Sequence, residues 1–172
     1  MNAEELRSLQ TPIKARYRET PESAFVTLSS RGQLGSESLT CRLETGRALV
    51  EAGLHPMAGG DGTWACSGDM LLEALVACAG VTLKAVATAL GIEVRGGAVI
   101  VEGDLDFRGT LGIDKTIPVG FRAIRLRFDL DSDAGEEQLV NLLKLTERYC
   151  VIYQTLRGPT ELTSSISATA SH

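Results

Sequence analysis

A helical period of apolar residues dominates the middle of the chain. From about Gly68 to Leu90 the apolar side chains cover most of a helix circumference, with one cysteine, Cys78, near the midpoint. Ser67 or Asp69 can cap the start of this helix, and Gly91 stands where it would end. Because a helix that is apolar nearly all round belongs inside a core, we expect this one to be central.

A period of two, typical of strands, marks the N-terminal part of the chain. The alternating segments predict a meander of three strands joined by polar turns. The expected elements, in order, are a short helix at 3–10 that Pro12 ends, strands at 13–19, 24–30 and 38–44, a loop at 31–38, and a short helix at 48–53. The glycine-rich stretch that follows, with Gly59, Gly60 and Gly62, is interpreted either as a binding loop or as a plain connector.

Strand patterns return after the long helix. Residues 92–109 predict a strand interrupted at Gly96 and Gly97, and residues 121–131 alternate with one break near Ala123 that suggests a bulge. A second helix at 134–149, a short helix from Cys150 to Leu156 and a final strand at 161–170 complete the expected order. Strands in runs with helices between them predict an α+β fold with mainly antiparallel sheet.

Length and charge narrow the class of protein. A chain of 172 residues suits a single domain at 13–172 with an N-terminal extension at 1–12. The net charge of −5 disfavours nucleic acid as a partner. The N-terminus does not resemble a secretion signal, and Asp69, Glu73 and Lys84 argue against a membrane-spanning helix, so we expect a cytoplasmic protein. No pattern indicates a cofactor or a metal site.

The four cysteines are the candidate reactive residues of the chain. None has CxxC spacing, which disfavours a zinc ribbon or a thioredoxin-type motif. Cys78 lies in an apolar helix, where a cysteine is usually an inert small hydrophobe, whereas Cys150 precedes a helix, where the thiolate is favoured. Cys41 on a strand is interpreted as structural, and Cys66 in the loop before the long helix is a rival partner for Cys78.

Two cysteine segments together resemble a known family. A central helix with VACAGVTL, a strand pair, and a second helix with RYCVIYQTL resemble the OsmC/Ohr superfamily over residues 13–168. The resemblance implies an intertwined homodimer in which sheets containing strands of both subunits wrap two long central helices. It also implies a site at the subunit interface that acts on organic hydroperoxides or hydrogen peroxide, with an external dithiol as reductant.

The resemblance also implies roles for the two thiols. Cys78 matches the cysteine that attacks the peroxide, and Cys150 matches the cysteine that resolves the sulfenic acid as a disulfide. The sequence departs from the family where Val151 follows Cys150, because the peroxidase branches often have proline there.

The helpers that the family provides are an arginine from the N-terminal hairpin and an acidic residue before the central helix. The hairpin offers Arg18, which we favour, besides Arg16 and Arg31. Gly68 occupies the aligned acidic position, so Asp69, one residue on, is the expected acid. Glu73 is the second candidate for that acid.

Three functions fit these observations. The first is a thiol peroxidase that reduces organic hydroperoxides through Cys78 and Cys150. The second is a non-enzymatic redox-sensing or small-ligand-binding module on the same fold, and the third is a structural dimer with inert cysteines.

Overall fold

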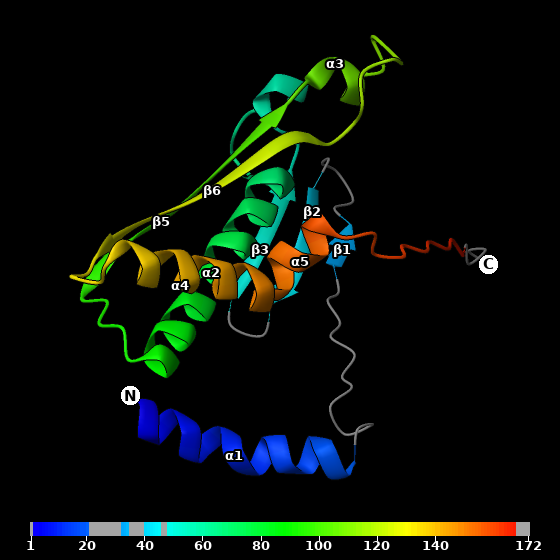
Figure 1. Cartoon of the computed structure of the whole chain (residues 1–172). Helices are drawn as coiled ribbons and strands as arrows, with labels where there is room; N and C mark the ends of the chain where they lie inside the picture. The colour runs from blue at the N-terminus through cyan, green and yellow to red at the C-terminus, as the bar shows by residue number, and fades with distance from the viewer. Residues whose placement is uncertain (1, 21–31, 35–39, 46–47, 168–172) are drawn as a thin grey trace.

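Helix α2 lies at the centre of the fold, with the β5–β6 ribbon on one side and α4 and α5 crossing it (Figure 1). The computed structural model describes every residue except 1, 21–31, 35–39, 46–47 and 168–172. Its helices are α1 (Ala3–Glu19), η2 (Pro56–Ala58), α2 (Ser67–Leu90), α3 (Phe107–Thr110), α4 (Glu136–Tyr149) and α5 (Val151–Arg157). Its strands are β1 (Gly32–Leu34), β2 (Thr40–Thr45), β3 (Ala48–Gly53), β4 (Ala65–Cys66), β5 (Gly96–Leu105) and β6 (Phe121–Asp131). The fold is α+β, which confirms the expected class.

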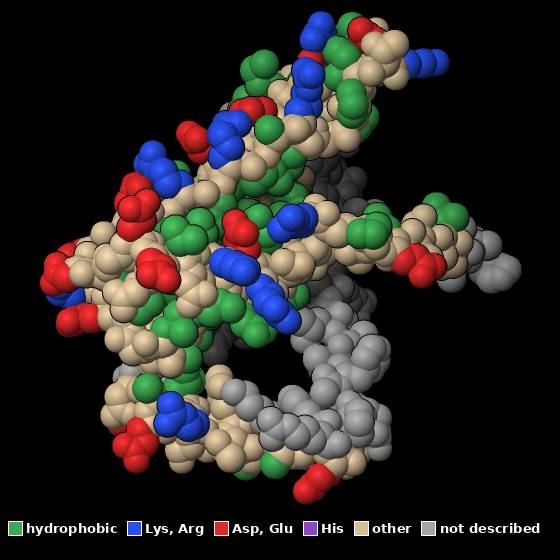
Figure 2. All heavy atoms as spheres, in the orientation of Figure 1, with side chains coloured by type: hydrophobic (Ala, Val, Ile, Leu, Met, Phe, Trp, Pro, Cys, Tyr) green, Lys and Arg blue, Asp and Glu red, His purple; other side chains and the backbone are tan. Residues whose placement is uncertain are grey.

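Two sheets flank the central helix. Strands β1, β2, β3 and β4 form one sheet in that order, antiparallel except for the parallel β3–β4 pair. Strands β5 and β6 form a long antiparallel ribbon in which Gly96 lies opposite Asp131 and Ile100 opposite Arg127. Acidic and basic side chains intermingle on the outer face of this ribbon (Figure 2). Arg125, for example, forms ion pairs with Glu102 and Asp104.

The bulge expected near Ala123 is confirmed. Asp104 pairs with Ala123 but Leu105 pairs with Phe121, so Arg122 is an extra residue in β6. Beyond it the strand alternates regularly, and the inward positions are Ile124, Leu126, Phe128 and Leu130. A bulge bends a strand and redirects its side chains, and here it separates the hairpin end from the part of β6 that packs on α2.

One face of α2 carries the core. Leu75, Ala79, Leu83 and Ala87 are all at most 3% exposed, and they follow the four-residue spacing of a helix face. Leu142 of α4 packs at one end of this row and Cys150 at the other. The helix is central, as expected, but in the single chain its opposite face is open, and Val81 there is 73% exposed. Among the described residues α2 is the one helix that is long and apolar enough to cross a membrane.

Helix α1 corrects two expectations. It continues through Pro12, where a stop was expected, and it includes residues 13–19, where a strand was expected. The segment is rich in strong helix formers, and an alternation of a few residues does not outweigh that preference. In the turn before the proline the Thr11 hydroxyl donates a hydrogen bond to the Arg7 carbonyl over 2.7 Å.

Pairing partners explain the remaining corrections among the strands. Residues 48–53 were expected as a helix but form β3, which is held between β2 and β4. Residues 32–34, expected as a loop, form β1. The strand predicted at 161–170 is not found at 161–167, where the chain pairs with no described strand. The strand predicted at 24–30 lies outside the described residues.

Two local predictions at α2 had different outcomes. Gly91 ends the helix in the left-handed conformation, with φ of 68°, as expected. The predicted cap is wrong, because Cys66 precedes the first helical residue and no side chain caps the helix.

The glycine-rich connector has defined local contacts. His55 Nδ1 accepts a hydrogen bond from the Met57 N–H over 3.0 Å, and the His55 ring stacks on Phe107 with ring centroids 4.9 Å apart.

Candidate active site

The structure brings Cys78 and Cys150 together. Cys78 lies on α2 and Cys150 at the junction of α4 and α5, 72 residues later in the chain, yet both belong to one packed cluster around Leu75 and Ala79. Cys78 packs against the cluster that contains Cys150, and each thiol shifts the pKa of the other. All three cysteines whose side chains are described are free thiols. The two cysteines that the resemblance paired are therefore neighbours in the reduced state.

Cys150 is fixed by the elbow between two helices. Its side chain is fully buried, its backbone N–H donates to the Thr146 carbonyl over 2.9 Å, and its Sγ accepts from the Tyr153 N–H at 3.5 Å. Gln154 ties the elbow together by donating its side-chain amide to the Glu147 carbonyl over 2.8 Å. Burial raises the pKa of the Cys150 thiol, because a buried thiolate loses its hydration.

Cys78 has the opposite environment. Burial acts to raise its pKa, but the backbone N–H of Ile152 and the Cys150 thiol act the other way, and the net pKa is lowered. The Val151 N–H and the Thr82 hydroxyl contribute in the same direction. Because these donors stabilise negative charge on sulfur, and because Cys78 is partly exposed, Cys78 is the thiol of the pair that ionises more readily.

The other two cysteines lie elsewhere. Cys66 precedes α2 by one residue and is 12 residues from Cys78, which corresponds to about 18 Å along a helix axis. A disulfide requires Cα atoms within about 7 Å, so Cys66 is not the intrachain partner of Cys78. Cys41 lies on β2, and its side chain is outside the described part of the chain.

The expected acidic helper is on α2 but away from the thiol pair. Asp69 is nine residues before Cys78, which is two and a half helical turns and therefore the opposite side of α2. Asp69 and Glu73 instead line a small hollow with Leu72, Val76 and Val101. Within one chain the structure does not bring either carboxylate to Cys78.

The candidate arginines are placed only in part. The backbone of Arg16 and Arg18 belongs to helix α1 rather than to a strand hairpin, and their side chains are outside the described part of the structure. Arg31 also lies outside the described residues. The role expected for Arg18 stays a prediction.

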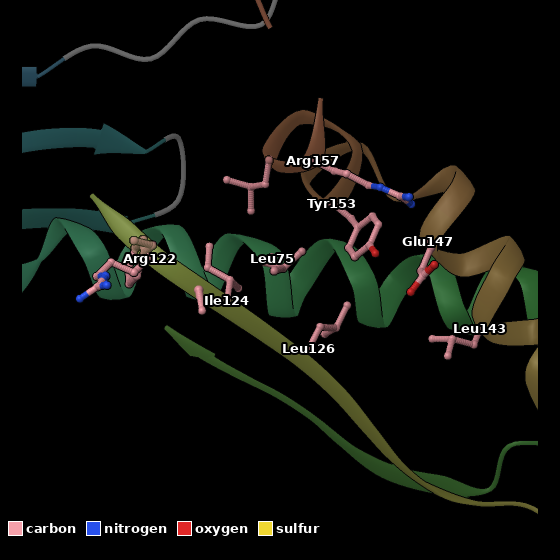
Figure 3. Close-up of a pocket in the computed structure, with 11 residues that line it drawn as sticks. Leu75, Arg122, Ile124, Leu126, Leu143, Glu147, Tyr153 and Arg157 are labelled. Atoms are coloured by element: carbon pink, nitrogen blue, oxygen red, sulfur yellow. The ribbon is translucent and has the colours of Figure 1, made fainter. Parts of the chain in front are cut away.

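An open groove runs beside the thiol cluster (Figure 3). It has a volume of about 440 Å³ and lies between β6, α2, α4 and α5. Its apolar walls are formed by Leu75, Phe121, Ala123, Ile124, Leu126, Leu143 and Leu156, and its polar lining by Arg122, Glu147, Tyr153 and Arg157. Leu75, Ile124, Leu126 and Tyr153 also pack in the cysteine cluster, so the groove and the cluster share these four side chains.

One end of the groove is a polar trio. The Tyr153 hydroxyl interacts with the Glu147 carboxylate and the Arg157 guanidinium, and Figure 3 shows all three side chains converging there. Burial raises the pKa of Tyr153, and the negative charge of Glu147 raises it further against the opposing effect of Arg157. Arg122 lies at the other end, where its guanidinium is 3.8 Å from Asp106.

Sequence reasoning missed Thr82, Tyr153 and the polar trio. The signal was present as helical spacing, since Thr82 is four residues after Cys78, and Tyr153 and Arg157 are three and seven residues after Cys150. As to metal ions, the described residues bring no three His, Cys, Asp or Glu side chains together in a way that could hold one.

The structure therefore combines an α+β fold with two free thiols in one packed cluster. Residues 60–165 match the family of OsmC-like proteins, and this chain belongs to that family. No curated protein matches the chain.

Solved structures share the fold at low sequence identity. The OsmC-like protein of Mycoplasma pneumoniae is 20% identical, with a TM-score of 0.64 over 77% of this chain and 89% of that one. An organic hydroperoxide resistance protein OsmC of Legionella pneumophila is 14% identical, with a TM-score of 0.61 over 78% of this chain and 93% of that one. An organic hydroperoxide resistance protein of Elizabethkingia anophelis is 14% identical, with a TM-score of 0.62 over 78% and 90%. These similarities confirm the expected OsmC-like fold.

Proposed function

We propose that this protein is a cysteine-based peroxidase that reduces organic hydroperoxides. The Cys78 thiolate attacks the terminal oxygen of the hydroperoxide, the O–O bond breaks, and Cys78 becomes sulfenic acid. The alkoxide leaving group takes up a proton from solvent and departs as an alcohol. The Cys150 thiol then attacks the Cys78 sulfur, which forms a disulfide and releases water. An external dithiol reduces the disulfide by exchange and is itself oxidised.

The observation that carries the proposal is the packing of two thiols with opposite pKa shifts in one cluster. A lowered pKa makes Cys78 the better nucleophile at neutral pH, while burial keeps Cys150 protonated and protected until a sulfenic acid forms beside it. The names of the Legionella and Elizabethkingia relatives support the choice of organic hydroperoxides as substrates. The apolar residues around the thiol pair favour an organic substrate over hydrogen peroxide.

A cytoplasmic homodimer is the proposed working form. The face of α2 opposite the core exposes Ala74, Ala77 and Val81, which suits the packing of a second central helix. Because Asp69 is remote from Cys78 in its own chain, we propose that Asp69 and Arg18 serve the thiol pair across this interface. The single domain at 13–172 stays part of the proposal, although α1 extends across residue 12.

A second candidate function is a non-enzymatic redox sensor or ligand-binding module. It is favoured by Val151, which follows Cys150 where peroxidases of the family often have proline. Such a module would form the same disulfide but would not turn over with a dithiol.

The test is disulfide mapping followed by turnover. One equivalent of cumene hydroperoxide is added to the reduced Cys41→Ser, Cys66→Ser protein, and intact mass and non-reducing peptide maps are recorded. We expect a rapid loss of two hydrogens, mapped to a Cys78–Cys150 bridge, and consumption of many equivalents of peroxide when dithiothreitol is present.

Variants separate the two functions. Cys78→Ser should abolish peroxide consumption, while Cys150→Ser should accumulate sulfenic acid that a dimedone probe can trap. A bridge without turnover would support the sensor, and full peroxide consumption by Cys78→Ser would exclude the peroxidase.

A further inference from the structure

The groove between β6 and the α4–α5 elbow lies outside the thiol pair. Neither Cys78 nor Cys150 lines the groove. Tyr153, in the first turn of α5 just after Cys150, does line it. Its volume of about 440 Å³ falls in the range of small-molecule pockets, which is roughly 300–1,000 Å³. Figure 2 shows hydrophobic side chains gathered in the hollow between the β5–β6 ribbon and the helices.

The lining has a consistent chemical pattern. Leu75, Ile124 and Leu126 form an apolar floor, and charged groups are confined to the two ends (Figure 3). Arg122 at one end is held only loosely by Asp106, at 3.8 Å, and its side chain is 59% exposed. Arg157 at the other end interacts with Tyr153 but forms no salt bridge with any of the residues that the structure describes.

The net charge of the groove lining indicates the charge of the ligand that would bind there. Two guanidinium groups stand against one carboxylate, Glu147, so the lining carries a net charge of about +1. A guanidinium with spare donors binds a carboxylate through charge-assisted hydrogen bonds, and an apolar floor retains an alkyl chain. A cationic head group would meet two like charges, and a neutral one would leave both arginines without a new partner.

We propose that this groove binds an anionic amphiphile, an alkyl or aryl carboxylate whose apolar part lies on Leu75, Ile124 and Leu126 and whose carboxylate is held by Arg157. The ligand class follows from the lining alone and does not depend on peroxidase activity. The negative charge of Glu147 repels the ligand's carboxylate and limits its affinity. Neutral substitutions at Arg157 and at Glu147 should therefore change the affinity in opposite directions.

The experiment is isothermal titration calorimetry with three probes of equal chain length. Decanoate, 1-decanol and decyltrimethylammonium are titrated into the full chain below their aggregation concentrations. We expect saturable binding of decanoate at one site per chain and binding of the other two that is at least about tenfold weaker, since each forfeits the charge-assisted contact. Equal binding of all three, or no binding of decanoate, would overturn the proposal.

Variants at the polar end test the placement. Arg157→Gln should weaken decanoate binding about fivefold, and Glu147→Gln should strengthen it about two- to fivefold. Arg148→Gln is the matched control, because Arg148 is an exposed α4 residue stacked on Tyr149 and does not line the groove. Leu143→Glu places a carboxylate in the groove wall at a position that is already 43% exposed, so it should fold and lose decanoate binding.

Two results would show that decanoate binds elsewhere: unchanged binding by Leu143→Glu, or equal effects of Arg157→Gln and Arg148→Gln. The same titrations on Cys78→Ser keep this site separate from the proposed reaction. That variant should bind decanoate normally while consuming no peroxide. Loss of decanoate binding in Cys78→Ser would contradict a groove site independent of the thiols.

Discussion

Cys78 packs against the cluster that contains Cys150, and the two thiol pKa values are shifted in opposite directions, lowered for Cys78 and raised for Cys150. Burial is the largest effect on Cys150 and raises its pKa, and the neighbouring Cys78 raises it further. For Cys78, the backbone N–H of Ile152 and the Cys150 thiol outweigh the effect of burial and lower its pKa. Cys78 therefore ionises more readily, and Cys150 stays protonated to higher pH.

This asymmetry predicts a pH-dependent order of alkylation. As pH rises, the thiolate of Cys78 forms first because its pKa is lowered, and the thiolate of Cys150 forms at higher pH because its pKa is raised. Short pulses of iodoacetamide at increasing pH, followed by peptide mass spectrometry, should label Cys78 before Cys150. Labelling of Cys150 at equal or lower pH would contradict the assignment of the nucleophile.

Removing the thiol donor should shift the Cys78 profile. In Cys150→Ala the Cys78 thiolate loses one hydrogen-bond donor, so the midpoint of its alkylation profile should move to higher pH. Cys66→Ala, a change at the distant N-terminus of α2, is the control and should leave the midpoint where it is.

Leu142 and Leu143 offer a matched test of the core on α4. Leu142 is 1% exposed against α2, while Leu143 beside it is 43% exposed. Leu142→Ala should lower the free energy of unfolding by about 2–5 kcal/mol, because it leaves a cavity, and Leu143→Ala by less than about 1.5 kcal/mol. Urea unfolding followed by circular dichroism measures both. Similar losses for the two variants would contradict the packing of α4 described above.

Two adjacent glycines at the start of β5 should respond differently to alanine. Gly97 has φ of 138°, and a Cβ there would overlap the backbone carbonyl oxygen of Asp129, whereas a Cβ on Gly96 would meet open space. Gly97→Ala should therefore cost about 2 kcal/mol or more in thermal or urea unfolding, while Gly96→Ala should be neutral or slightly stabilising. If both variants were neutral, the close approach of β5 and β6 at this point would be wrong.

Asp106 should titrate far below an ordinary aspartate. Hydrogen bonding to the Arg108 side chain lowers its pKa to about 2, with further help from the Arg108 backbone N–H. The stabilisation from this carboxylate is thus present above the unfolded-state pKa and is lost as pH falls through about 2. Carbonyl NMR titration should show this midpoint, and Arg108→Gln should raise it. A midpoint near 4 in the unmodified protein would contradict the contact.

The sequence predicted the elements whose signals are local and long. The α2 segment, the β6 alternation with its break, α4 and the turn of helix after Cys150 all carry their periodicity within a single stretch. The pairing of the two cysteine segments also came from the sequence, through a family resemblance. Cys78 by itself resembles an ordinary core residue, and its lowered pKa depends on the N–H groups of Val151 and Ile152, more than 70 residues away.

The misassigned segments depend on distant partners or on short patterns. Residues 48–53 suit a helix by composition, yet β3 forms because neighbours on both sides satisfy its backbone groups. Alternation at 13–19 was too brief to compete with helix preference. The groove escaped prediction because its lining comes from four elements, and no single stretch of sequence contains both Arg122 and Arg157, which lie at its two ends.

The extra residue at Arg122 changes the phase of β6. The inward–outward alternation of side chains shifts by one residue at the bulge. Phe121 and Ile124 therefore both face inward, although they are three positions apart. Length changes in the hairpin between β5 and β6 can therefore be absorbed at this point without turning Ile124 and Leu126 away from the cysteine cluster. The bulge thus uncouples the register of the hairpin end from that of the strand segment on α2, and its extra residue, Arg122, is also a residue of the groove lining.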